Sequence, residues 1–119
     1  MERILGIGGY FIRAQDPGAL VAWYRDNLGL DAGELWRQEV GVTVFAAFEA
    51  ETEYFGSREQ GVMVNFRVRD LDAMLAQLRE KGADVVEGTQ DMAGIGRFGW
   101  VTDPEGNRVE LWEAVPEGG

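Results

Sequence analysis

The hydrophobic positions of this chain follow two kinds of pattern, and the pair of patterns occurs twice along the sequence. Residues 9–13 and residues 63–67 alternate between the two faces of an extended chain, which predicts β-strands. Each strand precedes an aspartate, Asp16 or Asp70, that opens a stretch with apolar residues at helical spacing. The two aspartates are 54 residues apart, close to half of the chain, so the sequence indicates an internal duplication.

The first predicted helix starts after Asp16, a favourable N-cap residue, with Pro17 at the first helical position. Gly29 follows the last apolar residue and is typical of a helix C-terminus. The apolar stripe between them consists of Leu20, Trp23, Tyr24 and Leu28. Aromatic residues at this spacing are usually buried, so Trp23 and Tyr24 are interpreted as core residues rather than functional ones.

The second predicted helix is capped by Asp70 and ends at Gly82. Its apolar stripe consists of Leu71, Met74, Leu75 and Leu78. The spacing matches one face of an amphipathic helix that packs against a sheet. The two halves of the chain therefore predict the same order of elements, a strand, a helix and further strands.

The further strands are expected where apolar and polar residues alternate or where β-branched residues gather: residues 4–13, 41–48, 61–69, 85–86, 97–102 and 108–113. Residues 30–39 are expected to hold one or two short strands. A tight turn is predicted at Asp103–Asn107, where proline fixes one φ and glycine permits a positive one.

Three segments are expected to lack regular structure. Residues 88–96 are predicted to be a flexible stretch, and the tail at residues 116–119 is predicted to be loose. Residues 49–60 are polar and acidic and are predicted to link the halves. Tyr54 and Phe55 in this link either close over a pocket or partner, or pack on the domain itself; the sequence leaves both possibilities open.

The expected fold class is α+β, in one domain over residues 1–119, with one module at about residues 1–55 and another at about 61–115. Both helices are buried most simply on the outer faces of curled sheets. The opposite sheet faces would then line a cup.

Composition narrows the classes of function. Net charge is −10, which disfavours nucleic acid as a partner because phosphate backbones are repelled. The chain contains no cysteine and no histidine, so disulfides are excluded and the commonest transition-metal ligands are missing. No apolar run approaches the ~18–20 residues that span a bilayer, and no signal-peptide block stands at the N-terminus, so we expect a cytoplasmic protein without a membrane partner.

Three motifs carry a family resemblance. They are Asp16-Pro17 with Trp23-Tyr24-Arg25-Asp26-Asn27-Leu28-Gly29-Leu30, then Asn65-Phe66-Arg67-Val68-Arg69-Asp70-Leu71, and Asp103-Pro104-Glu105-Gly106-Asn107-Arg108-Val109-Glu110-Leu111-Trp112-Glu113. The chain resembles the vicinal oxygen chelate superfamily, which includes glyoxalase I, extradiol dioxygenases and bleomycin-resistance proteins. The resemblance implies two βαβββ modules that form a U-shaped sheet around a central cup, with helices on the outer face, and it implies a homodimer. Whether the modules pair within one chain or across two stays open.

The resemblance also locates the positions at which metal-binding relatives place their ligands. In this chain those positions hold Gly9, Phe45, Met63 and Glu110. Only Glu110 offers a hard oxygen ligand, whereas a catalytic transition-metal site usually needs about three nitrogen, oxygen or thiolate ligands. We therefore expect no metal and no other cofactor, and metal-dependent glyoxalase or dioxygenase activity is disfavoured.

In the related proteins the metal positions face into the cup, so the alternation of each strand assigns further residues to the same face. The predicted ligand-binding set is Phe11, Arg13, Phe45, Met63, Asn65, Arg67, Arg108, Glu110 and Trp112. Glu110 either pairs with an arginine or meets a cationic ligand group. Trp112 either stacks on a planar ligand or plugs the cup.

Three functions remain open after these exclusions. The favoured one is a metal-free small-molecule binding protein, dimeric as the resemblance implies, that holds a partly apolar ligand in the cup. The second is a lyase or isomerase of the glyoxalase type with Glu110 as the catalytic general base. The third is an accessory or partner-binding domain with a filled cup.

Overall fold

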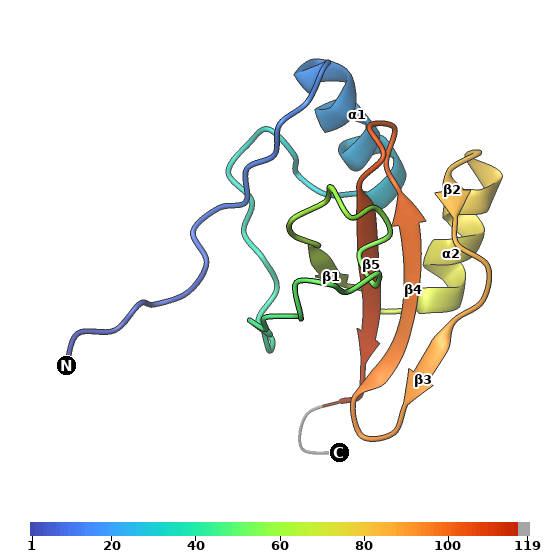
Figure 1. Cartoon of the computed structure of the whole chain (residues 1–119). Coiled ribbons are helices and arrows are strands. Elements are labelled where there is room, and N and C mark those ends of the chain that lie inside the picture. Colours follow the sequence, from blue (N-terminus) through green and yellow to red (C-terminus); the bar gives the residue numbers. More distant parts are fainter. Residues whose placement is uncertain (117–119) are drawn as a thin grey trace.

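The computed structural model describes residues 1–116, and residues 117–119 of the predicted tail lie outside the described part. Within this range the elements are α1 (Pro17–Leu28), β1 (Asn65–Arg67), α2 (Leu71–Glu80), β2 (Asp84–Val85), β3 (Gln90–Met92), β4 (Gly96–Thr102) and β5 (Arg108–Ala114). The two helices and the strands form the arrangement in Figure 1. The predicted α+β class is confirmed.

The strands form one mixed sheet in the order β1-β5-β4-β2, and β3 also pairs with β4. β1 runs parallel to β5, whereas β4 is antiparallel to its neighbours. Glu110 of β5 lies opposite Asn65 on one side and opposite Trp100 on the other. Residues in register share a face, so these three side chains are placed together in the middle of the sheet.

Both helices begin as the sequence predicts. The Asp16 carboxylate accepts a hydrogen bond from the Ala19 N–H at 3.1 Å, and the Asp70 carboxylate accepts one from the Ala73 N–H at 3.0 Å. Each bond satisfies an N–H group that the first helical turn leaves without an intrahelical partner. Helix α1 ends at Gly29, whose φ of 71° is the left-handed conformation that glycine adopts without strain.

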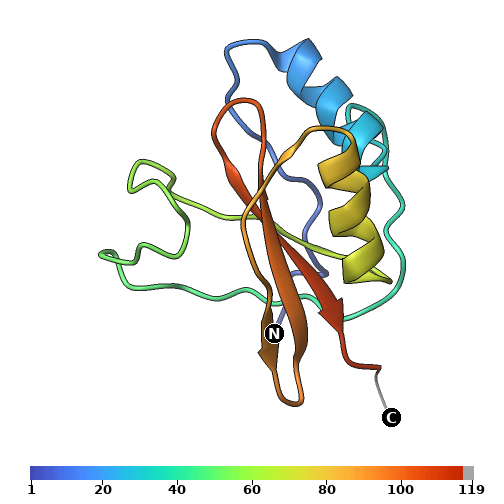
Figure 2. The same ribbon diagram turned by 90° about the vertical axis from the view of Figure 1, so that its right-hand side faces the viewer.

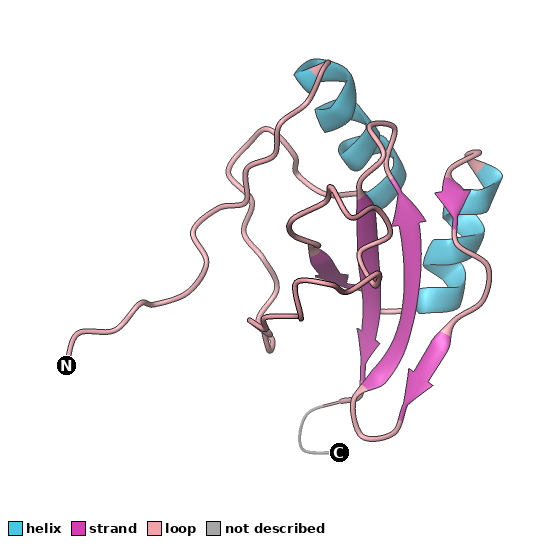
Figure 3. Cartoon of the chain, viewed as in Figure 1, coloured by secondary structure: helices cyan, strands magenta, loops and turns pink. Residues whose placement is uncertain are grey.

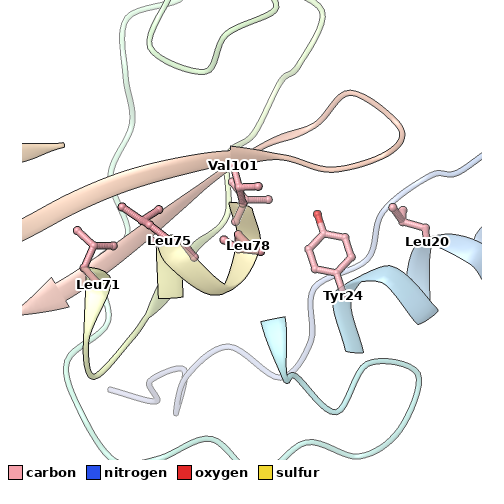
Figure 4. Packing of buried hydrophobic residues seen from close by; sticks show 8 residues of the cluster. Leu20, Tyr24, Leu71, Leu75, Leu78 and Val101 are labelled. Carbon is pink, nitrogen blue, oxygen red and sulfur yellow. The ribbon is translucent and has the colours of Figure 1, made fainter. Parts of the chain in front are cut away.

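The core lies between the helices and one face of the sheet. Figure 2 shows α1 and α2 on the same side of the sheet, with the green loop around residues 49–60 on the other. Figure 4 shows leucines of α2 packed beside Val101 of β4, with Leu20 and Tyr24 of α1 next to them. The buried cluster consists of Leu20, Tyr24, Leu71, Leu75, Leu78, Val101, Val109 and Leu111. The predicted apolar stripes of both helices therefore supply most of this core.

The first half of the chain differs from the prediction. Residues 4–13, 30–39 and 41–48 were predicted to contain strands, but within the described range they form none and run as the extended loops of Figure 3. A strand requires a neighbour that completes its ladder of hydrogen bonds. The sheet of this chain is assembled from residues 65–114, and none of these segments pairs with its open β1 edge. Apolar and polar residues alternate along these segments, but no neighbouring strand pairs with them.

The second half adds one strand that the sequence did not predict. Part of the stretch at residues 88–96, expected to be flexible, forms β3 and pairs with the start of β4. Ile95 donates its N–H to the Met92 carbonyl at 3.0 Å, which closes the hairpin. Burial does not drive this strand, because its residues are exposed, so its sequence lacks a hydrophobic signal.

Neither α1 nor α2 has the length and apolar character needed to cross a lipid bilayer.

Candidate functional site

Glu110 is the centre of the candidate site. It is 8% exposed and lies on the sheet face that points away from the helices. Its Oε1 accepts a hydrogen bond from the Asn65 amide at 2.7 Å, and its Oε2 accepts one from the Trp100 indole N–H at 3.1 Å. The Tyr54 hydroxyl donates a third, short hydrogen bond to Oε2. Three donors from β1, β4 and a loop thus stabilise one buried carboxylate.

Aromatic rings surround the bond between Tyr54 and Glu110. The Tyr54 ring stacks on Phe48 with centroids 5.5 Å apart and an interplanar angle of 24°. It meets Trp100 edge to face, with centroids 6.0 Å apart and an angle of 84°. Phe55 packs on Phe48 at 5.2 Å. The site therefore combines a buried acceptor with apolar walls, which is the composition of many small-molecule pockets.

The environment of Tyr54 keeps its hydroxyl protonated. Burial raises the pKa of this phenol well above its usual range, and the hydrogen bond to Glu110 and the negative charge of that carboxylate raise it further. A phenolate at this place would be desolvated and would lie against a second negative charge. At neutral pH Tyr54 is consequently a donor, and Glu110 is its acceptor.

Two of the three predicted arginines, Arg67 and Arg108, hold segments that cover the sheet. Arg108 donates from Nη1 to the Tyr54 carbonyl at 3.3 Å, and Arg67 donates from Nη2 to the Glu39 carbonyl at 2.7 Å. In the described part of the chain, neither guanidinium forms an ion pair with Glu110. The pairing of Glu110 with an arginine, which the sequence allowed, is replaced by the bonds to Tyr54, Trp100 and Asn65.

Gln60 anchors the end of the covering loop. Its amide N–H group donates to the Arg108 carbonyl at 2.8 Å, and its side-chain oxygen accepts from the Arg108 N–H at 2.8 Å. The side chain thus pairs with the backbone of β5 in both directions, as a neighbouring strand would. The loop over residues 49–60 is fixed at this end to the strand that carries Glu110.

Trp112 lies on the same face, two residues beyond Glu110, and is buried. Its ring stacks on Phe98 of β4, with centroids 5.9 Å apart and an interplanar angle of 6°. Its indole N–H donates to the Ile95 carbonyl at 3.1 Å. The Trp112 ring and its N–H are therefore both held by protein groups, so Trp112 forms a wall at one end of the site.

The remaining predicted site residues are not brought to Glu110. Phe11 and Phe45 are each 93% exposed, so neither ring packs on the site. Arg13 lies beside Glu105, near the start of α1, and Met63 is half-buried just before β1. Phe11, Arg13 and Phe45 belong to the segments that lack a strand partner, which explains why their predicted face is not formed in the single chain.

Sequence reasoning missed Trp100 and Tyr54. Trp100 had a usable signal, because the predicted turn at residues 103–107 joins two strands and pairs Trp100 with Glu110. Tyr54 had a weaker signal as an aromatic residue in an acidic link, for which closure over a pocket and packing on the domain were both left open. A loop without periodicity gives no direction for its side chains, so only the folded chain shows that Tyr54 reaches Glu110.

The residues present do not fit the divalent metal of related proteins. Among residues 1–116, no group of three or more acidic, histidine or cysteine side chains is positioned to hold an ion. Glu110 stands alone at the expected place, and three of its roughly four acceptor positions are taken by protein donors. The same occupancy leaves little of the carboxylate free to accept a substrate proton.

An open hollow of about 440 Å³ lies elsewhere, on the helix-bearing side of the sheet. It is lined by Leu30 after α1, Trp36, Phe66 of β1, and Met74 and Gln77 of α2. Charged residues also line it, Glu39, Arg67, Arg69 and Asp70, and both of these carboxylates are exposed. The Glu110 cluster has the more specific chemistry, because its buried carboxylate accepts three hydrogen bonds, and it is the candidate site.

Comparison with known proteins shows which family model the sequence matches. A family model described as "Glyoxalase-like domain" matches residues 9–112. This range includes both helices and all of the strands described above, apart from the last residues of β5. A search of curated proteins found no match.

Several solved structures share the fold. TnmS3, an antibiotic binding protein from Streptomyces sp. CB03234, is 21% identical with a TM-score of 0.64, over 97% of this chain and 100% of that one. A glyoxalase/bleomycin resistance protein/dioxygenase superfamily member from Sphaerobacter thermophilus DSM 20745 is 20% identical with a TM-score of 0.62, over 92% and 98% of the two chains. A domain of the same description from Frankia sp. EAN1pec is 16% identical with a TM-score of 0.63, over 95% and 100%. At these identities the likeness concerns the fold.

Proposed function

The chain belongs to the glyoxalase-like domain family, and we propose that it binds a small, partly apolar molecule at the Glu110 face of its sheet without the help of a metal ion. The observation that carries this proposal is the buried Glu110 carboxylate, which lies among aromatic rings and accepts hydrogen bonds from Tyr54, Trp100 and Asn65. Burial of a charge is unfavourable unless donors compensate it. A protein that retains such a group at an aromatic surface has the elements of a specific binding site.

The fold of TnmS3 supports the same proposal, since that protein is an antibiotic binding protein. The donor set at Glu110 supports binding over metal catalysis, because one carboxylate with its acceptors occupied cannot hold a transition metal. The occupied acceptors also favour binding over a general-base role for Glu110.

A thermal-shift screen tests the proposal. A ligand present at about 100 times its Kd stabilises the native state by about 2.7 kcal/mol, which raises the Tm by several degrees. We expect aromatic compounds with hydrogen-bond donors to raise the Tm of the wild type and to raise that of Glu110→Gln less. Silence across a broad aromatic library would contradict the proposal, and a stoichiometric transition metal in the purified protein would contradict its metal-free part.

A filled cup is the second candidate function, and Tyr54 itself favours it, because its ring already covers Glu110. In that case the domain serves a protein partner and needs no small ligand. The two candidates differ in the screen, since a permanently filled site gives no shift with any compound.

We further propose that two copies associate. Large apolar side chains are exposed along two of the three segments that lack strand partners, at Ile4, Leu5, Ile7, Tyr10, Phe11 and Ile12, and at Val40, Val42, Val44, Phe45 and Phe48. β1 is at the edge of the sheet and has β5 on one side only. Exposed apolar surface beside an open strand edge favours pairing with another chain.

Light scattering after size-exclusion chromatography tests the association. We expect a dimer for the wild type and a monomer for Val44→Lys, because a charge would enter the paired surface. The matched control is Leu35→Lys, which changes an exposed side chain outside the two segments. A monomeric wild type at micromolar concentration would contradict the proposal. The cytoplasmic location also stays a prediction, which cell fractionation tests.

A further inference from the structure

Tyr54 occupies the site in the manner of a bound molecule. Its phenol stacks on Phe48, meets the edge of Trp100 and donates to the Glu110 carboxylate. The ring thus makes one polar contact and two aromatic contacts, which together are what a flat aromatic ligand of this size would make. The groups that contact the Tyr54 ring at Glu110 and Trp100 belong to strands, whereas Tyr54 belongs to a loop.

The receiving groups belong to the sheet. Glu110 and Trp100 are opposite each other on β5 and β4, which are paired over seven residues each. Asn65 of β1 holds the other carboxylate oxygen. Side chains on paired strands keep their geometry when an occupant leaves, because the ladder and the helix-covered core fix the backbone.

Tyr54 belongs to a loop outside all helices and strands. Near the ring, the loop is held by Arg108, whose Nη1 meets the Tyr54 carbonyl, and by Thr52, whose hydroxyl oxygen accepts the Tyr54 N–H at 3.2 Å. Arg58 in the same loop pairs with Glu51, and both side chains are largely exposed. The exposed pair adds little stability, and the side chains that receive Tyr54 belong to paired strands, so opening at the site involves the Tyr54 segment rather than the sheet.

We propose that Tyr54 is a built-in stand-in for the ligand, and that the protein selects a planar aromatic molecule with a hydroxyl or N–H donor, which displaces the Tyr54 ring and donates to Glu110 in its place. This inference rests on the proposed binding function and assigns its ligand class. An ionised carboxylate is an acceptor only, so a displacing ring must restore the donor that Tyr54 removes. A ring without a donor leaves a buried charge short of one hydrogen bond and is disfavoured.

The test uses 4-methylphenol, which has the shape of a tyrosine side chain, and 4-methylanisole, in which a methyl group replaces the donor hydrogen. Affinities are measured by calorimetry on the wild type, Tyr54→Phe and Glu110→Gln. Tyr54→Phe keeps the aromatic ring and removes the hydroxyl that donates to Glu110. We expect 4-methylphenol to bind Tyr54→Phe at least about tenfold more tightly than the wild type, the effect of one hydrogen bond to a charged group.

Two further comparisons make the expectation specific. 4-Methylanisole should gain in Tyr54→Phe as well, because displacing the ring no longer costs a bond to Glu110, but it should bind each protein about tenfold more weakly than 4-methylphenol. Glu110→Gln should narrow this preference between the two probes, because a neutral acceptor replaces a charged one. Trypsin provides a measurement that needs no variant. Addition of 4-methylphenol to the wild type should speed cleavage after Arg58, because departure of the Tyr54 ring loosens its loop.

The outcomes separate this inference from the proposed function. Equal affinities for the two probes, an unchanged preference between them in Glu110→Gln, or protection of Arg58 from trypsin would overturn the stand-in role while leaving small-molecule binding intact. A screen in which other compounds bind but 4-methylphenol does not would also overturn it. No binding by any compound would remove the proposed function and this inference together. If Tyr54→Phe does not fold, the trypsin result and Glu110→Gln decide.

Discussion

The Tyr24 hydroxyl donates a hydrogen bond of 2.6 Å to the buried Asp103 carboxylate and thereby joins helix α1 to the turn between β4 and β5. Asp103 also accepts from the backbone N–H groups of Glu105 at 2.9 Å and of Asn107 at 3.0 Å. Glu105 in turn accepts the Gln15 N–H at 2.7 Å, just before the helix. The turn is therefore the attachment point of the first half of the chain to the second.

Removal of the Tyr24 hydroxyl should destabilise the protein. Tyr24→Phe leaves the buried Asp103 short of one donor, and we expect a loss of about 1–3 kcal/mol in the free energy of unfolding. Urea denaturation measures it as a lower midpoint with an unchanged m-value. The matched control is Tyr10→Phe, because Tyr10 senses the charge of Asp103 but does not donate to it in the structure. Equal midpoints for the wild type and Tyr24→Phe would show that the bond contributes nothing.

Stability should fall at alkaline pH. Burial, followed by the hydrogen bond to Asp103, raises the pKa of Tyr24 far above the ordinary value of 10.0. Below pH 10.0 the phenol is protonated in both states and its contribution to stability is complete. Above that pH the unfolded chain releases the proton and the folded chain retains it, so the free energy of unfolding decreases as pH rises. Burial raises the pKa of Tyr54 as well, with the same sign.

Urea titrations between about pH 9 and pH 11 measure this dependence. The free energy of unfolding should fall less steeply with pH in Tyr24→Phe. The difference in slope should correspond to up to about one proton per molecule. A parallel decline in wild type and variant would mean that Tyr24 titrates alike in the folded and unfolded chains.

A cavity in the core should be costly. Leu78 of α2 is completely buried among the helix-facing residues of the sheet, and Leu78→Ala should lower the free energy of unfolding by about 2–5 kcal/mol. Leu35→Ala removes the same atoms from a side chain that is 96% exposed and should change stability by less than about 0.5 kcal/mol. Chemical denaturation of both variants gives the comparison. Similar losses at the two positions would contradict the position of the core.

Gly96 should not accept a side chain. Its φ is 142°, and a Cβ there would lie 2.2 Å from the Glu113 carbonyl oxygen. Gly96→Ala should therefore cost about 2–5 kcal/mol, from backbone strain and overpacking together. Gly106→Ala is the control, because its φ of 87° is also positive but its Cβ would point into open space, so only ~1–2 kcal/mol of backbone strain is expected. A difference below the error of thermal denaturation would refute the close approach at β4.

Features that depend on near neighbours in the chain were predictable. Asp16 and Asp70 cap their helices, and the turn at Asp103–Asn107 forms, because each involves residues only a few positions apart. The alternation along β5 assigned Glu110 and Trp112 to one face, and the structure has them on that face. The helical stripes predicted the core for the same reason, since periodicity selects the buried face of an amphipathic element.

The strands of the first half were beyond this reasoning. Alternation shows that residues 41–48 suit a strand, but a strand also needs a partner, and in this chain these residues do not pair with the sheet built by the second half. Phe45 and Phe11 therefore stay exposed although their pattern predicts a cup-facing side. Strand pairing is a contact between distant segments, and a single sequence does not state which segments meet.

The amino-acid sequence by itself determined the two helices with their caps, the strand that carries Glu110, and the loss of the metal ligands, because local spacing and side-chain chemistry are properties of the chain alone. Only the tertiary structure decided that Trp100, Asn65 and Tyr54 converge on Glu110, across separations of 10, 45 and 56 residues. A loop side chain has no periodicity to direct it, so its partner is selected by the packing of the whole fold and by the need of a buried carboxylate for donors.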